Sequence, residues 1–228
     1  MTQKLCWICH SPANSAEHMV KKSDLRSVFG QVTQRRPLIK DSETHKNILI
    51  PGANSRLIKF KPSLCSICNN TRSQPHDRAW ERLSGDLRSR RPLLKAGDRI
   101  PMKEVFPGSV KESLESVHLY FLKLFGCYAV EYGIPLPLAH FGLCILNKVP
   151  YPHVYITFVS MASVSSGEDV VVGDITTITN DKQVVAASWY YCVGAIGIHI
   201  EYSLPGHPRL QAKRGWHPES INTYIRMQ

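Results

Sequence analysis

The sequence predicts an α+β protein in two parts: a zinc-stapled domain over residues 1–100 and a helix followed by an antiparallel sheet over residues 101–228. Three observations predict this class, namely two CxxC pairs, one long helical repeat of apolar residues, and several β-branched and aromatic runs between turn residues. The chain has 228 residues, of which 43% are hydrophobic, which is enough for one large or two small cores. We place the boundary near residue 100, because residues 83–107 are rich in Gly, Pro and Arg.

The positive charge is concentrated in the first part. The formal net charge is +10, and residues 1–100 hold 19 Lys and Arg against 8 Asp and Glu, whereas the rest holds 9 and 10. Such a surface favours a polyanionic partner, either nucleic acid or a lipid surface. The nearly neutral second part is not expected to grip DNA itself, and a protein-binding, oligomerising or substrate-gating role is open for it.

Cysteine content and hydropathy indicate in which cellular compartment the protein is expected. No uninterrupted apolar run approaches the roughly 20 residues that a bilayer requires, and the polar start MTQKLCWICH is not typical of a signal peptide. Seven cysteines, four of them in CxxC pairs, indicate metal binding better than a disulfide framework. We therefore expect a cytoplasmic protein without membrane contact.

Each part has its own expected elements. In the first part we expect one helix around SDLRSVFG and another that starts at Pro75. In the second part, apolar residues at helical spacing predict a helix over about residues 110–132, ended by Gly133. Four β-branched runs between residues 153 and 203 then predict a meander in which neighbouring strands pair in chain order. A short helix is expected after Pro218.

The two CxxC pairs carry the strongest chemical signal. Cys6 and Cys9 form CWIC, and Cys65 and Cys68 form CSIC. Zinc prefers four soft ligands in a tetrahedron, and each CxxC turn offers two sulfurs at the right separation. Four buried, metal-free cysteines are the alternative, but they would not require identical spacing. A closed four-thiolate site is structural, so any chemistry must lie elsewhere.

A group of polar residues adjoins the cysteine pairs. Glu17 and His18 follow the first pair, and Asn69 comes directly after Cys68. If zinc draws the pairs together, these three side chains converge. Carboxylate and amide oxygens suit Mg²⁺ or Mn²⁺, and a neutral imidazole can take a proton from water. The three side chains are sufficient for metal-assisted phosphodiester hydrolysis.

This order of motifs over about residues 5–82 resembles the zinc-containing HNH, or ββα-metal, nucleases, especially those of the phage recombination endonuclease VII type. The resemblance implies an N-terminal ββα-metal (treble-clef-like) domain that acts as a DNA endonuclease, with RNA left open as a substrate. It implies that His18 is the general base, that Glu17 and Asn69 bind one catalytic Mg²⁺ or Mn²⁺, and that Cys6, Cys9, Cys65 and Cys68 bind structural zinc.

Two parts of the resemblance are incomplete. RLIKFKPSLC offers no Asn close to Cys65 for the middle position of the motif, and Asn47 and Asn54 are the candidates, with a loop role favoured for either. His76 is a candidate further metal ligand or phosphate contact. The alternative is a surface histidine that caps the start of the helix. Asp77 is expected to serve the helix dipole rather than catalysis.

Basic residues flank the expected centre and suit phosphate oxygens: Lys21, Lys22, Arg72, Arg78 and Arg82. The leading hypothesis is a metal-dependent DNA endonuclease. The alternative is a non-catalytic zinc-finger module that binds nucleic acid or a protein partner. A third hypothesis is a toxin or antiphage effector whose nuclease is restrained by the second part or by another protein, and homo-oligomers through the second part stay open.

Overall fold

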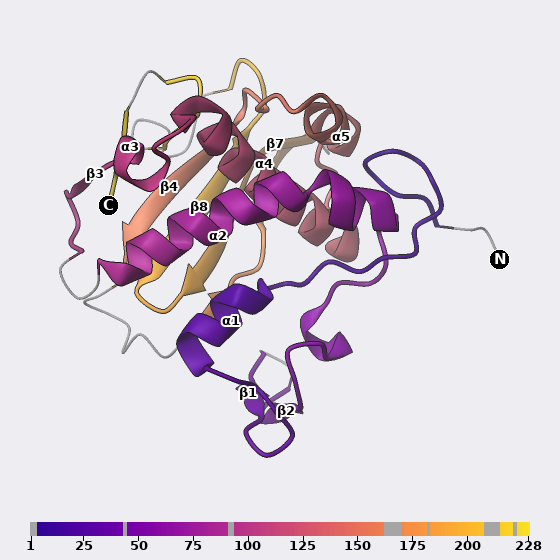
Figure 1. Ribbon diagram of the computed structural model, residues 1–228. Helices are drawn as coiled ribbons and strands as arrows, with labels where there is room; N and C mark the ends of the chain where they lie inside the picture. The colour runs from indigo at the N-terminus through magenta and orange to yellow at the C-terminus, as the bar shows by residue number, and fades with distance from the viewer. Residues whose placement is uncertain are drawn as a thin grey trace.

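The computed structural model describes residues 4–42, 45–90, 94–161, 170–181, 183–207, 215–220 and 223–228. It is a mixed fold of helices and antiparallel sheet, in which the long helices α2 and α4 lie on one face of the main sheet (Figure 1). Among the described residues, none of the helices combines the length and the apolar composition needed to cross a bilayer.

The N-terminal part is mostly loop with short elements. In chain order they are α1 (Lys22–Phe29), β1 (Leu38–Lys40), β2 (Ile48–Ile50), η1 (Arg56–Ile58), the π-helical turn η2 (Ile67–Arg72) and α2 (Gln74–Ser89). The helix expected around SDLRSVFG is α1. Pro75 lies in the first turn of α2, where its missing N–H leaves no hydrogen bond unmade.

The C-terminal part supplies the main sheet and the longest helix. Its elements are β3 (Arg99–Pro101), α3 (Met102–Val105), α4 (Val110–Tyr132), α5 (Leu138–Asn147), β4 (Val154–Ser160), β5 (Val170–Val172), β6 (Thr176–Asn180), β7 (Gln183–Val193), β8 (Ile196–Ser203) and β9 (Tyr224–Arg226). The expected helix over residues 110–132 is α4. It ends at Gly133, whose φ of 66° is left-handed and favours glycine.

The expected meander is correct for the pairs β6–β7 and β7–β8 but wrong for β4, which does not pair with the strand that follows it in the chain. The order is β4-β8-β7-β5, and β6 also pairs with β7. The first strand therefore pairs with the last, as in the register Ile156↔Ile200. The run DVVVGDITTIT is divided between β5 and β6, and both halves pair with the long strand β7. Hairpin-like spacing identified the strands but not the partner of β4.

The C-terminal tail is also different from expectation. The residues Tyr224–Arg226 form strand β9, not a helix, and pair antiparallel with β3 at Ile100↔Ile225. Ile100 and Ile225 are both buried. The end of the chain thus returns to the segment where the sequence placed the boundary.

The hydrophobic core is continuous across residue 100. Trp80 of α2 stacks on Tyr120 of α4 with ring centroids 5.8 Å apart, and it meets Phe121 edge-on at 4.7 Å. Tyr191 of β7 lies 6.2 Å from the same indole. The two predicted parts therefore contribute to one core, and the division into two domains near residue 100 stays a prediction.

Candidate metal cluster and adjoining pocket

The four predicted zinc ligands come together at one end of the molecule. The sulfur atoms of Cys6, Cys9, Cys65 and Cys68 all lie within 4.8 Å of one another, and Cys9 and Cys65 are 3.5 Å apart. Four thiols gathered from two CxxC turns match the donor set and geometry that structural zinc prefers. The cluster can therefore hold a metal ion.

Hydrogen bonds shape the cluster. The backbone N–H of Cys6 donates to the Ser11 carbonyl at 2.7 Å, which closes the first turn. Burial raises the pKa of Cys9, but hydrogen bonds from Ser11 outweigh it and lower that pKa to about 6. Arg72 donates to the sulfur of Cys68 at 3.0 Å. Burial raises the pKa of Cys68, and the hydrogen bond from Arg72, which the sequence assigned to phosphate, acts against this rise.

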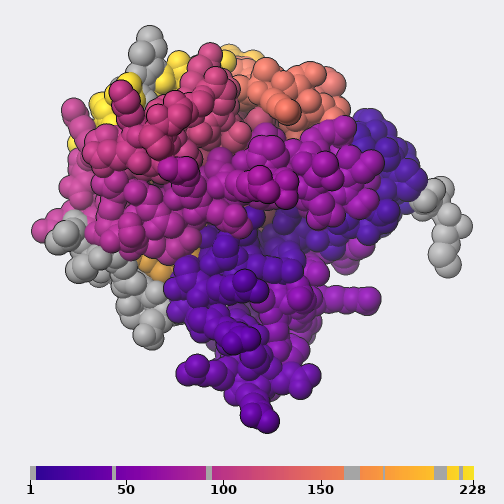
Figure 2. Space-filling model, in the orientation of Figure 1, coloured from indigo at the N-terminus to yellow at the C-terminus, as the bar shows by residue number. Residues whose placement is uncertain are grey.

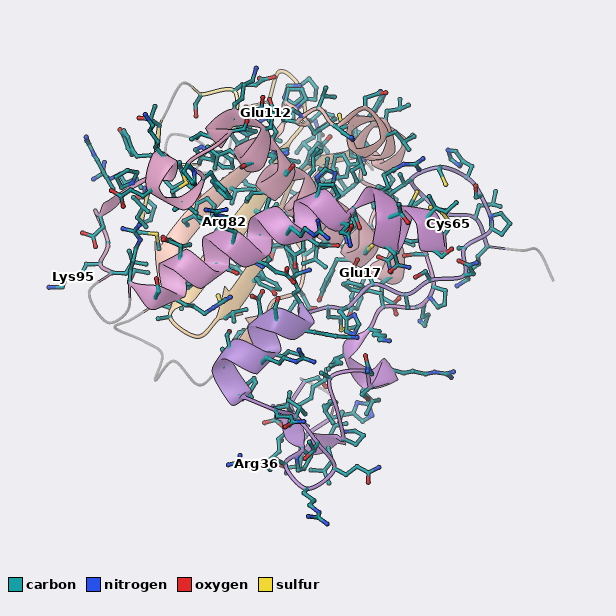
Figure 3. All side chains as sticks on the ribbon, viewed as in Figure 1. Glu17, Arg36, Cys65, Arg82, Lys95 and Glu112 are labelled. Atoms are coloured by element: carbon teal, nitrogen blue, oxygen red, sulfur yellow. The ribbon has the colours of Figure 1, made fainter. Side chains whose placement is uncertain are left out.

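Two segments next to the cysteine cluster run antiparallel to each other just before the helical segment that begins with η2. Ser15 and Leu64 exchange backbone hydrogen bonds of 2.8 and 3.3 Å, and the N–H of Phe60 donates to the Glu17 carbonyl at 3.0 Å. His18 pairs antiparallel with Lys59. Residues 15–19 and 58–64 are therefore neighbours, and η2 and α2 follow directly. Glu17 and Cys65 both lie near the start of this helical segment (Figure 3).

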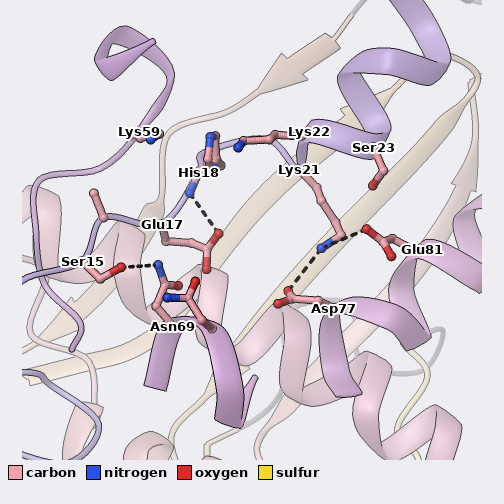
Figure 4. Close-up of a pocket in the computed structure, with 12 residues that line it drawn as sticks. Ser15, Glu17, His18, Lys21, Lys22, Ser23, Lys59, Asn69, Asp77 and Glu81 are labelled. Carbon is pink, nitrogen blue, oxygen red and sulfur yellow. Dashed lines mark hydrogen bonds and ion pairs between the residues drawn. The ribbon is translucent and has the colours of Figure 1, made fainter. Parts of the chain in front are cut away.

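The three residues expected to converge line one pocket of about 410 Å³ (Figure 4). It lies between the antiparallel segments, α1 and the start of α2. Its lining consists of Ser15, Ala16, Glu17, His18, Lys21, Lys22, Ser23, Lys59, Asn69, Asn70, Asp77 and Glu81. Glu17, His18 and Asn69 thus all line the same pocket, and their convergence on one metal ion stays a prediction.

His18 is held in one orientation. Its Nε2 lies 3.2 Å from the Ala53 carbonyl oxygen, which can only accept, so Nε2 carries the proton and Nδ1 keeps its lone pair. Burial lowers the pKa of His18 to about 4, and the charges of Lys59 and Lys22 act in the same direction, against Glu17. The imidazole is therefore neutral at pH 7 and can accept a proton.

Glu17 is held by a lysine of the second part. One carboxylate oxygen accepts from the His18 backbone N–H at 2.9 Å, and the other lies 2.5 Å from Nζ of Lys123. The side chain of Lys123 is fully buried, and its ammonium also contacts Ser73 at 3.1 Å and Asp77 at 3.3 Å. Burial lowers the pKa of Lys123, but the carboxylates of Glu17 and Asp77 reverse this and raise it.

Lys123 is a residue of this site that the sequence motifs did not identify. Its signal was present, because a lysine interrupts the apolar run VHLYFLKLFGCY within α4. A buried lysine needs a carboxylate partner. Which carboxylates these are is visible only in the fold, since Glu17 lies more than 100 residues earlier in the chain.

Asn69 presents a free acceptor. Its amide nitrogen donates to the Ser15 hydroxyl at 2.9 Å. Its oxygen is buried and has no hydrogen-bond partner in the described part of the chain. A buried acceptor of this kind is satisfied by a water or a hard cation. Asn69 therefore fits the role of an oxygen ligand.

The remaining predicted contacts differ in position. Lys21 and Lys22 line the pocket, and Lys21 pairs with Asp77 at 3.5 Å and with Glu81 at 3.4 Å. Arg78 is exposed on α2 outside the pocket lining. Arg82 donates to the Val105 carbonyl and lies over the Phe106 ring.

His76 and the two candidate asparagines also lie outside the pocket lining. His76 is 1% exposed, not a surface residue, and burial lowers its pKa to about 4. Neither of its ring nitrogens has a hydrogen-bond partner among the described residues. Asn47 is a loop residue with φ of 56° that donates to Asp41. Asn54 follows Ala53, whose carbonyl orients His18.

Comparison with known proteins gives no relative from which to assign this site. No protein-family model matches the chain, and neither the curated proteins nor the solved structures yield a match. The lining of the pocket itself includes a neutral imidazole, a carboxylate, an unpartnered amide oxygen and several ammonium groups. Such a set can activate water and bind phosphate oxygens.

Proposed function

We propose that this protein is a metal-dependent endonuclease that hydrolyses phosphodiester bonds of DNA. The observation that carries the proposal is the shared pocket, which is lined by neutral His18, by Glu17 and by Asn69 with its unpartnered oxygen. Two antiparallel segments, a following helix and a four-cysteine cluster support the resemblance to ββα-metal nucleases.

The residues of this chain then have distinct roles. The Ala53 carbonyl fixes the tautomer of His18, and Nδ1 accepts the proton of the attacking water. Glu17 and Asn69 would hold one Mg²⁺ or Mn²⁺. When bound, this ion would stabilise the negative charge on the phosphate and on the leaving oxygen. Lys22 and Lys59 attract the phosphate backbone to the pocket. The four cysteines hold structural zinc.

A second function is favoured by the charge of the pocket. Lys21, Lys22 and Lys59 line it together with three carboxylates, and the Glu17 carboxylate is already paired with Lys123. Lys21 is paired with Asp77 and Glu81, whereas Lys22 and Lys59 have no ion-pair partner among the described residues and can bind phosphate without a catalytic cation. The second candidate is therefore a non-catalytic zinc module that binds nucleic acid through the same pocket.

Cutting of supercoiled plasmid separates the two functions. We expect zinc-loaded wild type to nick or linearise the plasmid with Mg²⁺ or Mn²⁺ and to leave it intact in EDTA. His18→Ala should lower the rate by at least about 100-fold, the usual contribution of a general base. His140→Ala, at an exposed position on α5, is the matched control and should cut like wild type.

One result of these experiments would overturn the nuclease proposal. If wild type binds plasmid in a mobility-shift assay but leaves it uncut with either cation, the nuclease proposal fails and the binding module is retained. Zinc content and thermal melting of His18→Ala, measured beside the control, exclude loss of folding as the cause of lost cutting.

A further inference from the structure

A hairpin projects from the rim of the pocket. We call described residues 31–42 and 45–57 the hairpin arm, which contains β1, β2 and η1. In the space-filling view the arm protrudes at the bottom, away from the rest of the molecule (Figure 2). Arg36 lies on this protrusion, far from the C-terminal elements (Figure 3).

One face of the arm is apolar and open to solvent. Ile39 and Leu49 are cross-strand partners, and they are 64% and 60% exposed. Successive residues of a strand alternate between faces, so Leu38 and Ile50 point the other way, and Ile50 is buried. One face of this two-stranded hairpin is therefore packed against the protein. Ile39 and Leu49, on the other face, belong to no hydrophobic core of the described residues.

The surroundings of the apolar pair are cationic. Exposed basic residues of the arm are Arg35, Arg36, Lys46 and Arg56. Over residues 31–57 the sequence holds five basic residues against two acidic ones, Asp41 and Glu43, and the Asp41 carboxylate accepts from the Asn47 N–H at 2.7 Å. An apolar strip among positive charges complements a polyanion that also offers apolar surface, such as the edges of base pairs.

The arm is continuous with the pocket. The carbonyl of Ala53, within the arm, contacts the His18 ring, and Lys40 donates to Leu57 at 3.0 Å to hold the ribbon against the returning chain. Lys59, two residues beyond the arm, lines the pocket. A polymer with its phosphate in the pocket can therefore extend along the arm.

We propose that the hairpin arm enters the major groove of B-form DNA, with Ile39 and Leu49 against base edges and the flanking Arg and Lys on phosphates. This inference rests on the proposed function for the polymer in the pocket. A two-stranded ribbon fits the roughly 12 Å width of this groove, whereas the deep, narrow major groove of A-form RNA excludes it. A second copy fits poorly, since twofold pairing of this face would oppose like charges.

Fluorescence anisotropy with a labelled DNA duplex tests the inference, in a His18→Ala background without divalent cation so that nothing is cut. The double variant Arg35→Ala/Arg36→Ala should weaken binding about 10-fold and reduce the slope of log affinity against log salt by about 2, as expected for two lost phosphate contacts. Lys103→Ala/Lys111→Ala, exposed outside the arm, is the control and should bind unchanged.

A second double variant tests the contribution of Ile39 and Leu49 to duplex binding. Ile39→Thr/Leu49→Thr keeps β-branched or strand-compatible side chains at outward positions, so the fold should persist. It should weaken duplex binding about 10-fold with an unchanged salt slope, because no phosphate contact is lost. Unaltered binding by both arm variants, equal affinity for duplex RNA, or a change of sedimentation in place of DNA affinity would each overturn the inference.

The outcomes also separate this inference from the nuclease proposal. If the arm variants bind weakly while wild type leaves plasmid intact, the arm is confirmed as a DNA-binding element and the nuclease proposal fails. If wild type cuts plasmid while both arm variants bind like the control, the nuclease proposal stands and the arm inference fails.

Discussion

The indole of Trp7 occupies the space that a side chain on Gly126 would need. A Cβ atom added to Gly126 would lie 2.6 Å from ring carbons of Trp7. Gly142 of α5 allows a similar approach, since its Cβ would lie 3.0 Å from the Ile8 carbonyl oxygen. The first cysteine turn therefore packs closely on α4 and α5 at two glycines. This packing attaches the four-cysteine cluster to the C-terminal part of the protein.

Gly126→Ala should consequently destabilise the protein. The added methyl group forces the Trp7 ring to move within a buried contact, and overpacking of this kind costs about 1–3 kcal/mol. The midpoint of urea unfolding and the zinc occupancy measured after dialysis should both fall. Gly85→Ala, in α2, is the control, because a Cβ there meets nothing within 4 Å. The control should be neutral or stabilising by up to about 1 kcal/mol, and an equal loss in both variants would refute the packing argument.

Lys123→Met should be strongly destabilising. It removes the ammonium that pairs with Glu17 and Asp77, and breaking a buried ion pair on one side costs about 3–5 kcal/mol. Chemical unfolding measures this loss. Lys111→Met on the same helix is the control, because that side chain is 78% exposed and its pairing contributes little. If the two methionine variants unfold alike, Lys123 does not anchor the pocket.

The proposed nuclease activity should persist to an unusually low pH. His18 must be unprotonated to act as a base, and burial lowers its pKa to about 4, so kcat/KM should hold from pH 7 down to about pH 5 and fall below that. An ordinary histidine would lose activity near pH 6.5. Lys59→Gln should move the decline to higher pH, since the Lys59 charge contributes to the lowering. Lys61→Gln is the exposed control, and identical profiles for both variants would exclude this electrostatic role.

Stability should depend on pH through His118. Burial lowers its pKa to about 3, so the unfolded state binds more protons and the free energy of unfolding falls as pH drops below 6.5. Between pH 7 and 5.5 the part of this loss that comes from His118 should be on the order of 1 kcal/mol, beside the contributions of His18 and His76. His118→Asn should be less stable overall but should show a shallower dependence over this range, and an unchanged dependence would contradict the linkage.

Cys68→Ser should release zinc and unfold the N-terminal part, because structural zinc contributes on the order of 10 kcal/mol in small modules. Metal content and cooperative melting report on this. Cys144→Ser, outside the cluster, is the control and should keep both. A Cys68→Ser protein with full zinc and a cooperative transition would contradict the four-thiolate site.

The sequence predicted the elements whose signals are local. The apolar spacing that ends at Gly133 gave α4 with its observed bounds, and the matched CxxC pairs gave the cysteine cluster. It did not predict that β4 pairs with β8, or that the tail pairs with β3. Strand pairing over long separations depends on which faces must be buried together, and this leaves only a weak mark on any one segment.

The sequence by itself determined which chemistry is present: four thiols at zinc spacing, the Glu17-His18 dipeptide, and Asn69 at the start of a helical segment. The tertiary structure alone decided how the groups are supported, by setting Lys123 against Glu17 and the Ala53 carbonyl against His18. The physical reason is that residue spacing encodes short-range geometry, whereas the partner of a buried charge is chosen by the packing of elements distant in the chain.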